Sequence, residues 1–479
     1  MKRFYLILAL AVLFAPSCTK TEAEWNTGSD ELPENFGPNF FGYNMMNTYY
    51  LWNSEIQEGL RSWSSADNPA EKVKSIRYKD AYGNDIDRWT MMTDDFTAFS
   101  SSVDGTSTTF GYSLAFYSTS GSNDVEAFIR YTSEGSPARL AGLSRGQSIR
   151  KVDGIALTRE NFSAIASERL YGEKPVEITL SDGSSMKLSP VNMYEEPVLL
   201  TKVFEGNGRR IGYMVYNGFT LESWSSLVTA FNGFKEKGID DLILDLRYNQ
   251  GGYVITENLL ASMIAPKDAV EKGMVFSKEI YNSDMGNEET RFSWTHTVPT
   301  DGGAISVNTS SSNPGIDRLY AIVTGSSASA SESLLTGLIP YLDVTMIGSR
   351  TYGKYCGGVL MSSAKWYESV KEELIEKDER MYRTGVLQSA DWGIYLMVSR
   401  YADVYGNTPS MPSGMEPDIE CEDMPNQPFQ LGDPGEHMLK TALELAGFNV
   451  SGTKSAPGDT RTADELDYLP EGYGIRIIR

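Results

Sequence analysis

A serine-rich turn and a lysine further along the chain are the residues whose types and spacing could do chemistry. The turn, residues 326–332, reads Ser-Ser-Ala-Ser-Ala-Ser-Glu, and Lys354 follows 25 positions after Ser329. A serine hydroxyl becomes a useful nucleophile when a neighbouring base takes its proton, and a neutral lysine is one base that does so. The pair therefore predicts a hydrolase.

The scarcity of histidine favours lysine as the base. The chain contains only His296 and His437, and neither stands in a recognisable catalytic context, which argues against a Ser-His-Asp triad. A lysine that acts as a base must be neutral, so its pKa must fall from about 10.4 to about 7, a shift that burial can produce. We therefore expect Lys354 to be buried.

The segments around the serine turn indicate how it is positioned. An apolar run at 319–324 precedes the turn and a helical pattern at 333–339 follows it, which predicts a strand, a tight turn and a helix. The N-terminus of a helix favours negative charge and so suits a developing oxyanion. A second apolar strand at 241–246 runs into Gly251 and Gly252, where glycines allow backbone N–H groups to turn toward a ligand.

Together these segments resemble the tail-specific, or C-terminal processing, serine proteases. The resemblance implies that Ser329 is the nucleophile and Lys354 the general base. It also implies that the N–H of Ala330 and an amide of Gly251 or Gly252 form the oxyanion hole. The runs that carry it are 245–252, 327–332, 351–354 and the Gly-Met-Glu-Pro-Asp-Ile segment at 414–419.

One of the residues expected to support the base departs from the family pattern. Glu332 matches an acidic residue of the family's serine motif, where a supporting role is expected, although the helix dipole alone also favours an acid in a first turn. Many family members carry glutamine four residues after the lysine, where this chain has Gly358. Gln388 is one candidate to replace that glutamine; a bare Ser329/Lys354 dyad is the preferred alternative.

Length and charge limit the classes of function. The chain has 479 residues, enough for about three domains of ordinary size. Its 42 basic and 64 acidic residues give a formal net charge of −22, which argues against nucleic acid as a partner. No cofactor and no metal site are expected, and polypeptides are the expected substrates.

The first 18 residues resemble a bacterial lipoprotein signal. A basic start and an apolar run end in a small residue before Cys18, which implies removal of residues 1–17 and a lipid anchor on Cys18 in the bacterial cell envelope. Plain secretion is the alternative. Polar residues 18–38 are typical of a flexible stalk. In an oxidising compartment Cys356 and Cys421 could pair or remain thiols.

Two units are predicted between the stalk and the catalytic core. Residues 39–105 carry large apolar side chains at helical spacing and predict a small helical domain. Residues 106–193 alternate short β-like runs with turns, and the segment 136–154 resembles the helix-turn-strand signature of PDZ domains, which bind polypeptide C-termini by adding a strand to a sheet edge. A structural brace is the alternative. The resemblance puts the peptide-binding loop at Gly111, Tyr112, Ser113 and Leu114.

Residues 194–448 predict the catalytic core. Strand candidates at 211–216, 241–246, 319–324, 345–348 and 393–398 alternate with helices, which indicates a multidomain α/β protein. The family resemblance implies a crotonase-like β-β-α spiral for this core. Residues 449–479 form a C-terminal tail whose apolar end, 473–479, either adds a strand to the core or lies in the peptide groove.

The resulting hypothesis is a serine endopeptidase of the cell envelope, periplasmic or surface-facing, that captures polypeptide C-termini or unfolded segments and cleaves them through an acyl-enzyme. A second hypothesis is a catalytically inactive peptide-binding lipoprotein that retains the protease fold. A third, a glycan-binding surface lipoprotein, rests only on the 8 Trp and 27 Tyr residues.

Overall fold

The structure is a computed structural model and describes residues 25, 31–119, 121–300, 302–448, 450, 463–466, 468 and 475–478. The predicted signal peptide, residues 1–17, and the predicted lipidation site Cys18 lie outside the described residues, as does the first part of the predicted stalk. Within the described part of the chain, no helix is both long enough and apolar enough to cross a membrane.

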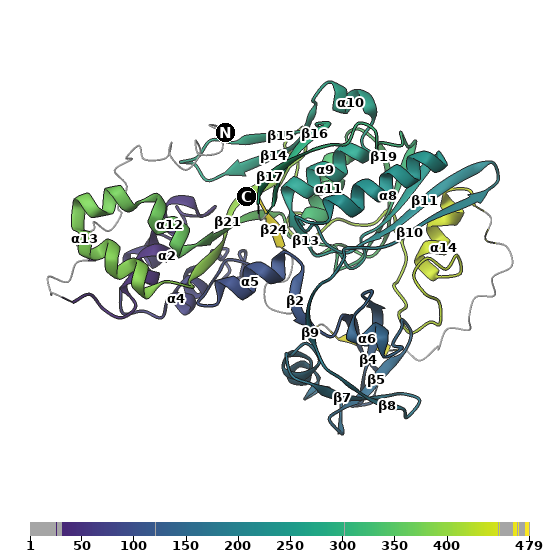
Figure 1. The fold of residues 1–479 in the computed structure, drawn as a ribbon, viewed down its shortest axis with the longest axis horizontal. Helices are drawn as coiled ribbons and strands as arrows, with labels where there is room; N and C mark the ends of the chain where they lie inside the picture. Colours follow the sequence, from purple (N-terminus) through teal and green to yellow (C-terminus); the bar gives the residue numbers. More distant parts are fainter. Residues whose placement is uncertain are drawn as a thin grey trace.

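A six-stranded sheet forms the centre of the predicted core (Figure 1). Its order is β10-β11-β12-β18-β19-β22; β10 and β11 are antiparallel, and all other neighbours are parallel. The strands predicted at 211–216, 241–246, 319–324 and 345–348 are all present in it. The bounds are β10 Val198–Gly206, β11 Arg209–Tyr216, β12 Asp241–Asp245, β18 Arg318–Val323, β19 Asp343–Gly348 and β22 Ile419–Glu420.

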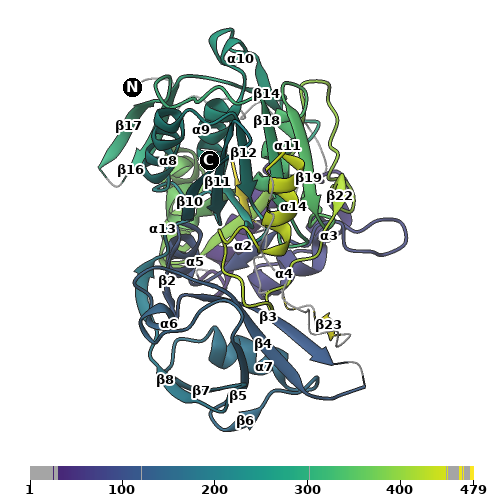
Figure 2. The same ribbon diagram turned by 90° about the vertical axis from the view of Figure 1, so that its right-hand side faces the viewer.

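Both faces of this sheet are buried. On β11, Met214 and Tyr216 belong to one apolar cluster, whereas Tyr213 and Val215 belong to another. Strands buried on both faces have almost continuous apolar sequences, which is why they were recognisable. Helices α8 (Trp224–Lys237), α9 (Val254–Ile264) and α11 (Ala330–Leu338) contribute to the first cluster. Helix α14 (His437–Leu445) contributes to the second and lies across the sheet in Figure 2.

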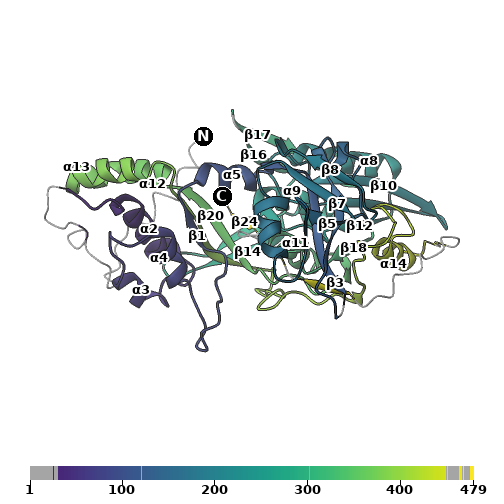
Figure 3. The same ribbon diagram turned by 90° about the horizontal axis from the view of Figure 1, so that it is seen from below.

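A second sheet has seven strands, in the order β13-β24-β20-β21-β14-β15 with β1 paired to β21. Helices α9 and α11 lie between the two sheets (Figure 3). The C-terminal strand β24 pairs in parallel with both β13 and β20, so the predicted addition of a tail strand to the core is what the structure has. The bounds are β1 Met91–Thr93, β13 Gly251–Tyr253, β14 Val275–Tyr281, β15 Glu288–Arg291, β20 Cys356–Ser362, β21 Gly393–Ala402 and β24 Ile475–Ile477. Helix α10 (Lys267–Glu271) and the hairpin β16 (Thr295–Thr300) and β17 (Gly303–Asn308) complete this region.

A helical layer covers one side of the second sheet (Figures 1 and 3). It contains α2 (Phe36–Tyr49), α3 (Gln57–Arg61), α4 (Pro69–Ile76) and α5 (Phe96–Val103), from the region predicted to be helical. Two helices from the predicted core, α12 (Ser363–Ser369) and α13 (Lys371–Gln388), join it. The Tyr367 hydroxyl, for example, donates to the Gly37 carbonyl at 2.9 Å.

A smaller β-rich unit lies beside the core. Its sheet has the order β23-β3-β4-β5-β7-β8, with β6 paired to β5, and a separate pair, β2 and β9, leads into and out of it. The edge strand β23 comes from the C-terminal region, Ala463–Leu466, and runs antiparallel to β3. The other bounds are β2 Thr106–Thr109, β3 Tyr112–Thr119, β4 Val125–Thr132, α6 Pro137–Leu140, β5 Ser148–Val152, β6 Ile155–Ala156, α7 Phe162–Ile165, the π-helical turn η1 Ala166–Leu170, β7 Val176–Leu180, β8 Ser185–Leu188 and β9 Val191–Tyr194.

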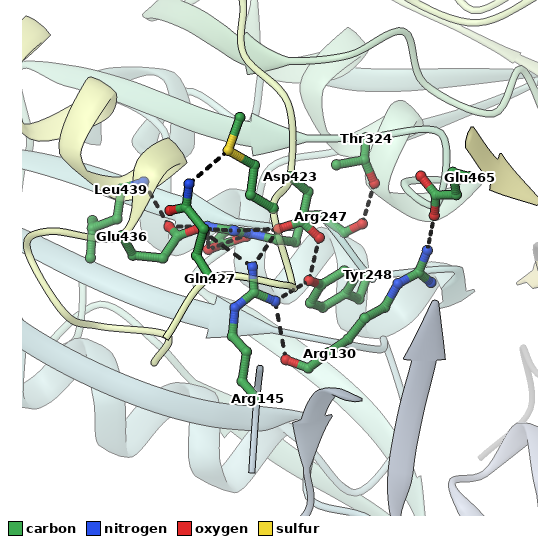
Figure 4. Close-up of polar contacts among 12 residues, drawn as sticks. Arg130, Arg145, Arg247, Tyr248, Thr324, Asp423, Gln427, Glu436, Leu439 and Glu465 are labelled. Carbon is green, nitrogen blue, oxygen red and sulfur yellow. Dashed lines mark hydrogen bonds and ion pairs between the residues drawn. The ribbon is translucent and has the colours of Figure 1, made fainter. Parts of the chain in front are cut away.

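A buried charged network, which we call the Arg145 network, ties this unit to the core (Figure 4). The Arg145 guanidinium donates at 2.6 Å to both the Asp423 carboxylate and the Tyr248 hydroxyl. Arg247 donates to Asp423 at 3.1 Å and to Glu436 at 2.8 Å. Because all five side chains lie in or next to the interface, the position of the β-rich unit depends on paired charges.

Candidate active site

The serine turn and the double-glycine turn lie side by side at one edge of the six-stranded sheet. Strands β12 and β18 are parallel neighbours, and Asp245 pairs with Ile322 near the carboxyl end of each strand. The carboxyl ends of parallel strands are where α/β folds place ligand sites. The Ala328 N–H donates to the Asn249 carbonyl at 3.0 Å, so the two turns are bonded directly to each other.

The serines of the turn have different environments. Ser327 Oγ donates to the Leu246 carbonyl at 2.8 Å, and Ser331 Oγ donates to the Asn249 carbonyl at 3.0 Å. Both hydroxyls thus serve to hold the two turns together. Ser329 is fully buried, and its Oγ has no hydrogen-bond partner among the described residues. A buried hydroxyl without a partner is costly to a fold, so Ser329 differs in this respect from Ser327 and Ser331.

Ser329 has a strained backbone. It precedes α11 as the N-cap residue with φ 64° and ψ −112°, in a region that residues with a Cβ rarely adopt. Ala330, the next residue, is the first of α11, and the first N–H groups of a helix have no partner within the helix. The strand-turn-helix geometry predicted from the sequence is therefore present, with Ala330 N–H available at the helix N-terminus.

The two glycines differ in what their amides do. Gly251 N–H donates to Asn249 Oδ1 at 2.8 Å, so Gly251 is wrong as an oxyanion donor because its own turn uses that N–H. Phe219 bonds to the Gly251 carbonyl and to the Tyr253 N–H, at 2.8 and 2.7 Å. Because successive backbone groups of a strand point to opposite sides, Gly252 turns its N–H and carbonyl toward β24. A Cβ at Gly252 would lie 2.4 Å from the Phe219 carbonyl oxygen, so only glycine fits.

Glu332 connects the serine turn to the lysine turn. It is fully buried, and its Oε2 accepts hydrogen bonds from the Ser329 N–H at 2.8 Å and the Lys354 N–H at 2.9 Å. Its Oε1 accepts from the Gly353 N–H at 2.8 Å and from the Thr351 hydroxyl. Burial raises the pKa of the Glu332 carboxyl above its usual value, although these four hydrogen bonds lower it. Glu332 is thus more than a first-turn acid favoured by the dipole.

Lys354 is fully buried, as expected for a base that must be neutral. Its Nζ donates to the Tyr395 hydroxyl at 2.8 Å. The same nitrogen lies 4.7 Å from the centroid of the Tyr395 ring and 5.3 Å from that of Trp89. The head group of the lysine is therefore enclosed by two aromatic side chains from β21 and from the segment before β1.

Gln388 is wrong as a substitute partner for the lysine. Its Oε1 accepts from the Gly37 N–H at 2.8 Å, and its Nε2 donates to the Pro33 carbonyl at 2.8 Å. Both polar atoms of the amide thus anchor the start of α2. The physical reason is that α13, which carries Gln388, belongs to the helical layer and not to the catalytic edge of the sheet.

The segment at 414–419 is hydrogen-bonded to the turn that leads into the lysine. The Thr351 N–H donates to the Met415 carbonyl at 3.0 Å, and the Met415 N–H donates to Thr351 Oγ1 at 2.7 Å. Asp418 Oδ2 accepts from the Met346 N–H at 2.8 Å, which ties the segment to β19. The four matching runs therefore meet around one centre.

The remaining reactive groups play no part in this centre. His296 is buried in the β16–β17 hairpin, where burial lowers the pKa of its imidazole to about 4. Cys356 and Cys421 are buried in two different apolar clusters and are not joined to each other by a disulfide. Among the described residues, no group of three or more His, Cys, Asp and Glu side chains is arranged to hold a metal ion.

The predicted peptide-binding loop is partly occupied by the chain itself. The Gly111 N–H donates to Thr109 Oγ1 at 2.9 Å, and the Leu114 N–H donates to the Tyr171 hydroxyl at 3.0 Å. Tyr112 is buried, and its hydroxyl donates to the Leu170 carbonyl at 2.9 Å. Ser113 pairs with Tyr131 of β4, directly before a register shift in the pairing of β3 with β4. Nearby, the outer edge of β3 pairs with β23.

Tyr395 and Trp89 are site residues that sequence reasoning missed. Tyr395 lies 41 positions after Lys354, in a strand that was predicted for its apolar character alone. Trp89 lies in the region predicted as a helical domain. Aromatic residues are frequent in both regions, so nothing distinguished these two. The only sign of an unusual environment for the lysine was the glycine at position 358.

Residues 210–421 match the sequence model of peptidase family S41. Among curated proteins, a carboxyl-terminal-processing protease of a Picosynechococcus species is 25% identical over 226 residues, covering 46% of this chain and 49% of the relative. A carboxyl-terminal-processing protease of a Synechocystis species is 26% identical over 227 residues, covering 46% and 47%. The chain thus matches about half the length of these curated relatives.

The fold also has a solved counterpart. A crystal structure of a Bacteroides fragilis protein assigned to the S41 proteases is similar over 85% of this chain and 97% of its own, with a TM-score of 0.62 and 20% sequence identity. At that identity the likeness concerns the fold, which is the mixed α/β fold of S41 protease structures.

Proposed function

Because residues 210–421 belong to peptidase family S41, alongside carboxyl-terminal-processing proteases, we propose that this protein is a serine endopeptidase with a Ser329/Lys354 dyad. The observation that carries the proposal is the shared carboxylate of Glu332, which holds the backbones of both residues at one centre. Among the described residues Ser329 Oγ is buried without a hydrogen-bond partner, and Lys354 Nζ lies between the rings of Trp89 and Tyr395.

In the proposed reaction, Ser329 Oγ attacks the carbonyl carbon of the scissile peptide bond while Lys354 Nζ accepts the hydroxyl proton. Burial disfavours the charged form of a lysine, which suits this role. The N–H groups of Ala330 and Gly252 stabilise the oxyanion of the tetrahedral intermediate. When the C–N bond breaks, the proton on Lys354 passes to the leaving amine, and water then hydrolyses the acyl-serine ester.

We further propose that the core has a crotonase-like spiral and that the β-rich unit is PDZ-like and captures polypeptide C-termini or unfolded segments. The pairing of β23 with the outer edge of β3 supports a strand-binding role, because it is the mode by which such units take a peptide. A structural brace is the competing role, and the Arg145 network fits it. Binding of a C-terminal peptide, measured by fluorescence anisotropy, and loss of that binding when a charged residue is introduced into β3, would distinguish the two roles.

The proposed location is the bacterial cell envelope, with a lipid anchor on Cys18. A Cys18→Ser variant expressed with its signal is expected in the soluble extracellular or periplasmic fraction, whereas the unchanged protein is expected with the membranes. Equal distribution of the two forms would contradict the anchor.

The test of the activity uses protein that starts at Thr19, incubated with an unfolded polypeptide beside Ser329→Ala and Lys354→Ala variants. A form that ends at Gly474 is assayed in parallel, because β24 faces Gly252. Cleavage that both substitutions abolish is the expected result. Equal cleavage by all variants would disprove the dyad, and peptide binding without cleavage by any form would favour the inactive peptide-binding lipoprotein.

A further inference from the structure

Tyr395 lies directly beside the proposed base. It belongs to β21, the antiparallel neighbour of β20, and pairs with Leu360 in the register of the two strands. Its side chain is 1% exposed, and its hydroxyl accepts a hydrogen bond of 2.8 Å from Lys354 Nζ. The ring also contacts Phe99, at 6.2 Å between centroids, on the side of the helical layer. The position of the hydroxyl is therefore restrained by the packing of the ring against Phe99 and by the hydrogen bond from Lys354.

Gly358 provides the space that the Tyr395 ring occupies. A Cβ at position 358 would lie 2.6 Å from Tyr395 Cε2 and 2.5 Å from Met397 Cε, closer than real Cβ atoms approach their neighbours. A side chain at position 358 and the Tyr395 ring in its present place therefore exclude each other. Position 358, four residues after Lys354, is where the sequence resemblance led us to expect a glutamine.

We propose that Tyr395 is the positioning residue of Lys354 and takes the place that a side chain at position 358 would otherwise fill. The inference rests on the proposed function, in which Lys354 is the base. A neutral amine has two N–H bonds and one lone pair. Donation of one N–H to Tyr395 restricts rotation about the last C–N bond of the lysine, and so fixes the direction of the lone pair that receives the Ser329 proton.

The Tyr395 hydroxyl also acts on the charge state of the lysine. A hydrogen-bond acceptor favours the charged form of an amine over the neutral form. Its removal therefore makes Lys354 easier to deprotonate, although the amine is then less well oriented. A tyrosine that only fills space has no such effect, because a phenylalanine fills nearly the same space.

The first test is Tyr395→Phe, with a quenched-fluorescence peptide that the wild-type enzyme cleaves. We expect kcat to fall about 10- to 100-fold with little change in KM, and the ascending limb of the pH profile of kcat/KM to move to lower pH. The matched control is Tyr401→Phe, on the same strand, whose hydroxyl bonds to Ser410 Oγ at 2.6 Å. An unchanged kcat and an unmoved limb in Tyr395→Phe would overturn the inference.

The second test moves the proposed partner of Lys354 from position 395 to position 358. Gly358→Gln alone is expected to lose activity because its Cβ meets the Tyr395 ring. Gly358→Gln combined with Tyr395→Ala is expected to be more active than Tyr395→Ala alone, since the amide then has room beside the lysine. A folded double variant no more active than Tyr395→Ala would contradict a shared role for the two positions.

Ser329→Ala and Lys354→Ala accompany both tests. If the wild type cleaves and these two variants do not, an unaffected Tyr395→Phe refutes the positioning role alone. If Lys354→Ala cleaves like the wild type, the proposed dyad fails, whatever the result at Tyr395.

Discussion

Ser329 and Lys354 donate their backbone N–H groups to the same atom, Oε2 of Glu332, at 2.8 and 2.9 Å. One buried carboxylate thus fixes the backbone at both proposed catalytic positions, whereas the Lys354 side chain is placed by its contacts with Tyr395 and Trp89. The conformation of the nucleophile and that of the base are therefore coupled through a residue that does not itself take part in the proposed chemistry.

Glu332→Gln is expected to lower both activity and stability. The amide nitrogen cannot accept, so about half of the four donors that now bond to the carboxylate lose their partner, at about 1–3 kcal/mol for each buried unsatisfied group. Urea unfolding and peptide cleavage measure the two effects. Glu416→Gln, at an exposed carboxylate paired with Arg350 in the neighbouring segment, is the control and should change neither.

Replacing Arg145 is expected to weaken the attachment of the β-rich unit to the core. Arg145→Ala leaves the partly buried Asp423 with Arg247 as its remaining cationic partner in the network, so the loss of stability should be below the roughly 3–5 kcal/mol typical of a buried charge left without any partner. The variant should unfold at lower urea concentration and should be cut by proteases near the unit's connections. Arg150→Ala, which removes an exposed pair with Glu126, is the matched control.

The Arg145 network should also make the protein sensitive to acid. Burial raises the pKa of the Asp423 and Glu436 carboxyls, but Arg145 and Arg247 outweigh it and hold both pKa values below the usual 3.8 and 4.5. Since the folded pKa values are lowered, this stability is present above about pH 4.5 and is lost as the pH falls through the lowered values. The difference in the free energy of unfolding between the wild type and Arg145→Ala, measured at several pH values, should become smaller at acidic pH.

His296 should produce a second pH dependence at higher pH. Burial lowers its pKa from 6.5 to about 4, so the unfolded chain binds a proton that the folded chain does not. Stability is therefore full above pH 6.5 and falls as the pH drops toward 4, by up to about 3 kcal/mol. His296→Phe should remove this slope, whereas His437→Gln should keep it. A wild-type slope that persists in His296→Phe would contradict the assignment.

The strained backbone of Ser329 should be measurable as stability. A residue with a Cβ at φ 64° and ψ −112° costs about 1–3 kcal/mol, most of which glycine avoids. Ser329→Gly is therefore expected to be more resistant to urea than Ser329→Ala, although both are inactive. If the two variants unfold at the same urea concentration, the backbone strain at position 329 is absent.

The parts of the candidate site that lie in short continuous segments could be predicted from the sequence. The serine turn, the double glycine and the lysine turn each follow or precede a strand buried on both faces, and such strands are apolar throughout. Arg247 and Asp245, which belong to the matching run 245–252, are buried and bonded to each other at 2.9 Å. Glu332 was partly predictable, because its place in the first turn is local, but its bond to Lys354 spans 22 positions.

The failures concern contacts between segments far apart in the sequence, which local patterns do not specify. Tyr395 reaches Lys354 only because β20 and β21 pair in one particular alignment, and nothing in an apolar strand sequence specifies that alignment. Gln388 was proposed as a replacement for the missing glutamine, but α12 and α13 leave the core and pack against α2. The pairing of β23 with β3 joins residues more than 300 positions apart and has no local signal.

The C-terminal strand supplies a final prediction about activity. Ile475–Ile477 pairs with Gly251–Tyr253 on one side, and Ile477 pairs with Gly358 on the other. The N–H of Gly252, a proposed oxyanion donor, is thereby turned toward the backbone of the chain's own tail. We expect this strand to lie where an extended substrate would pair with β13, so that the tail and the substrate compete.

A form that ends at Gly474 should therefore cleave an unfolded polypeptide faster per folded molecule than the longer chain. The same form should be less stable, because Ile477 is 1% exposed and its burial contributes about 1.5–3 kcal/mol. A synthetic peptide with the sequence of residues 473–479 should inhibit the shortened form competitively, and a scrambled peptide of equal composition should not. If shortening lowers stability but leaves the rate per folded molecule unchanged, and the peptide does not inhibit, then β24 is a structural strand and Gly252 is not the donor that the oxyanion uses.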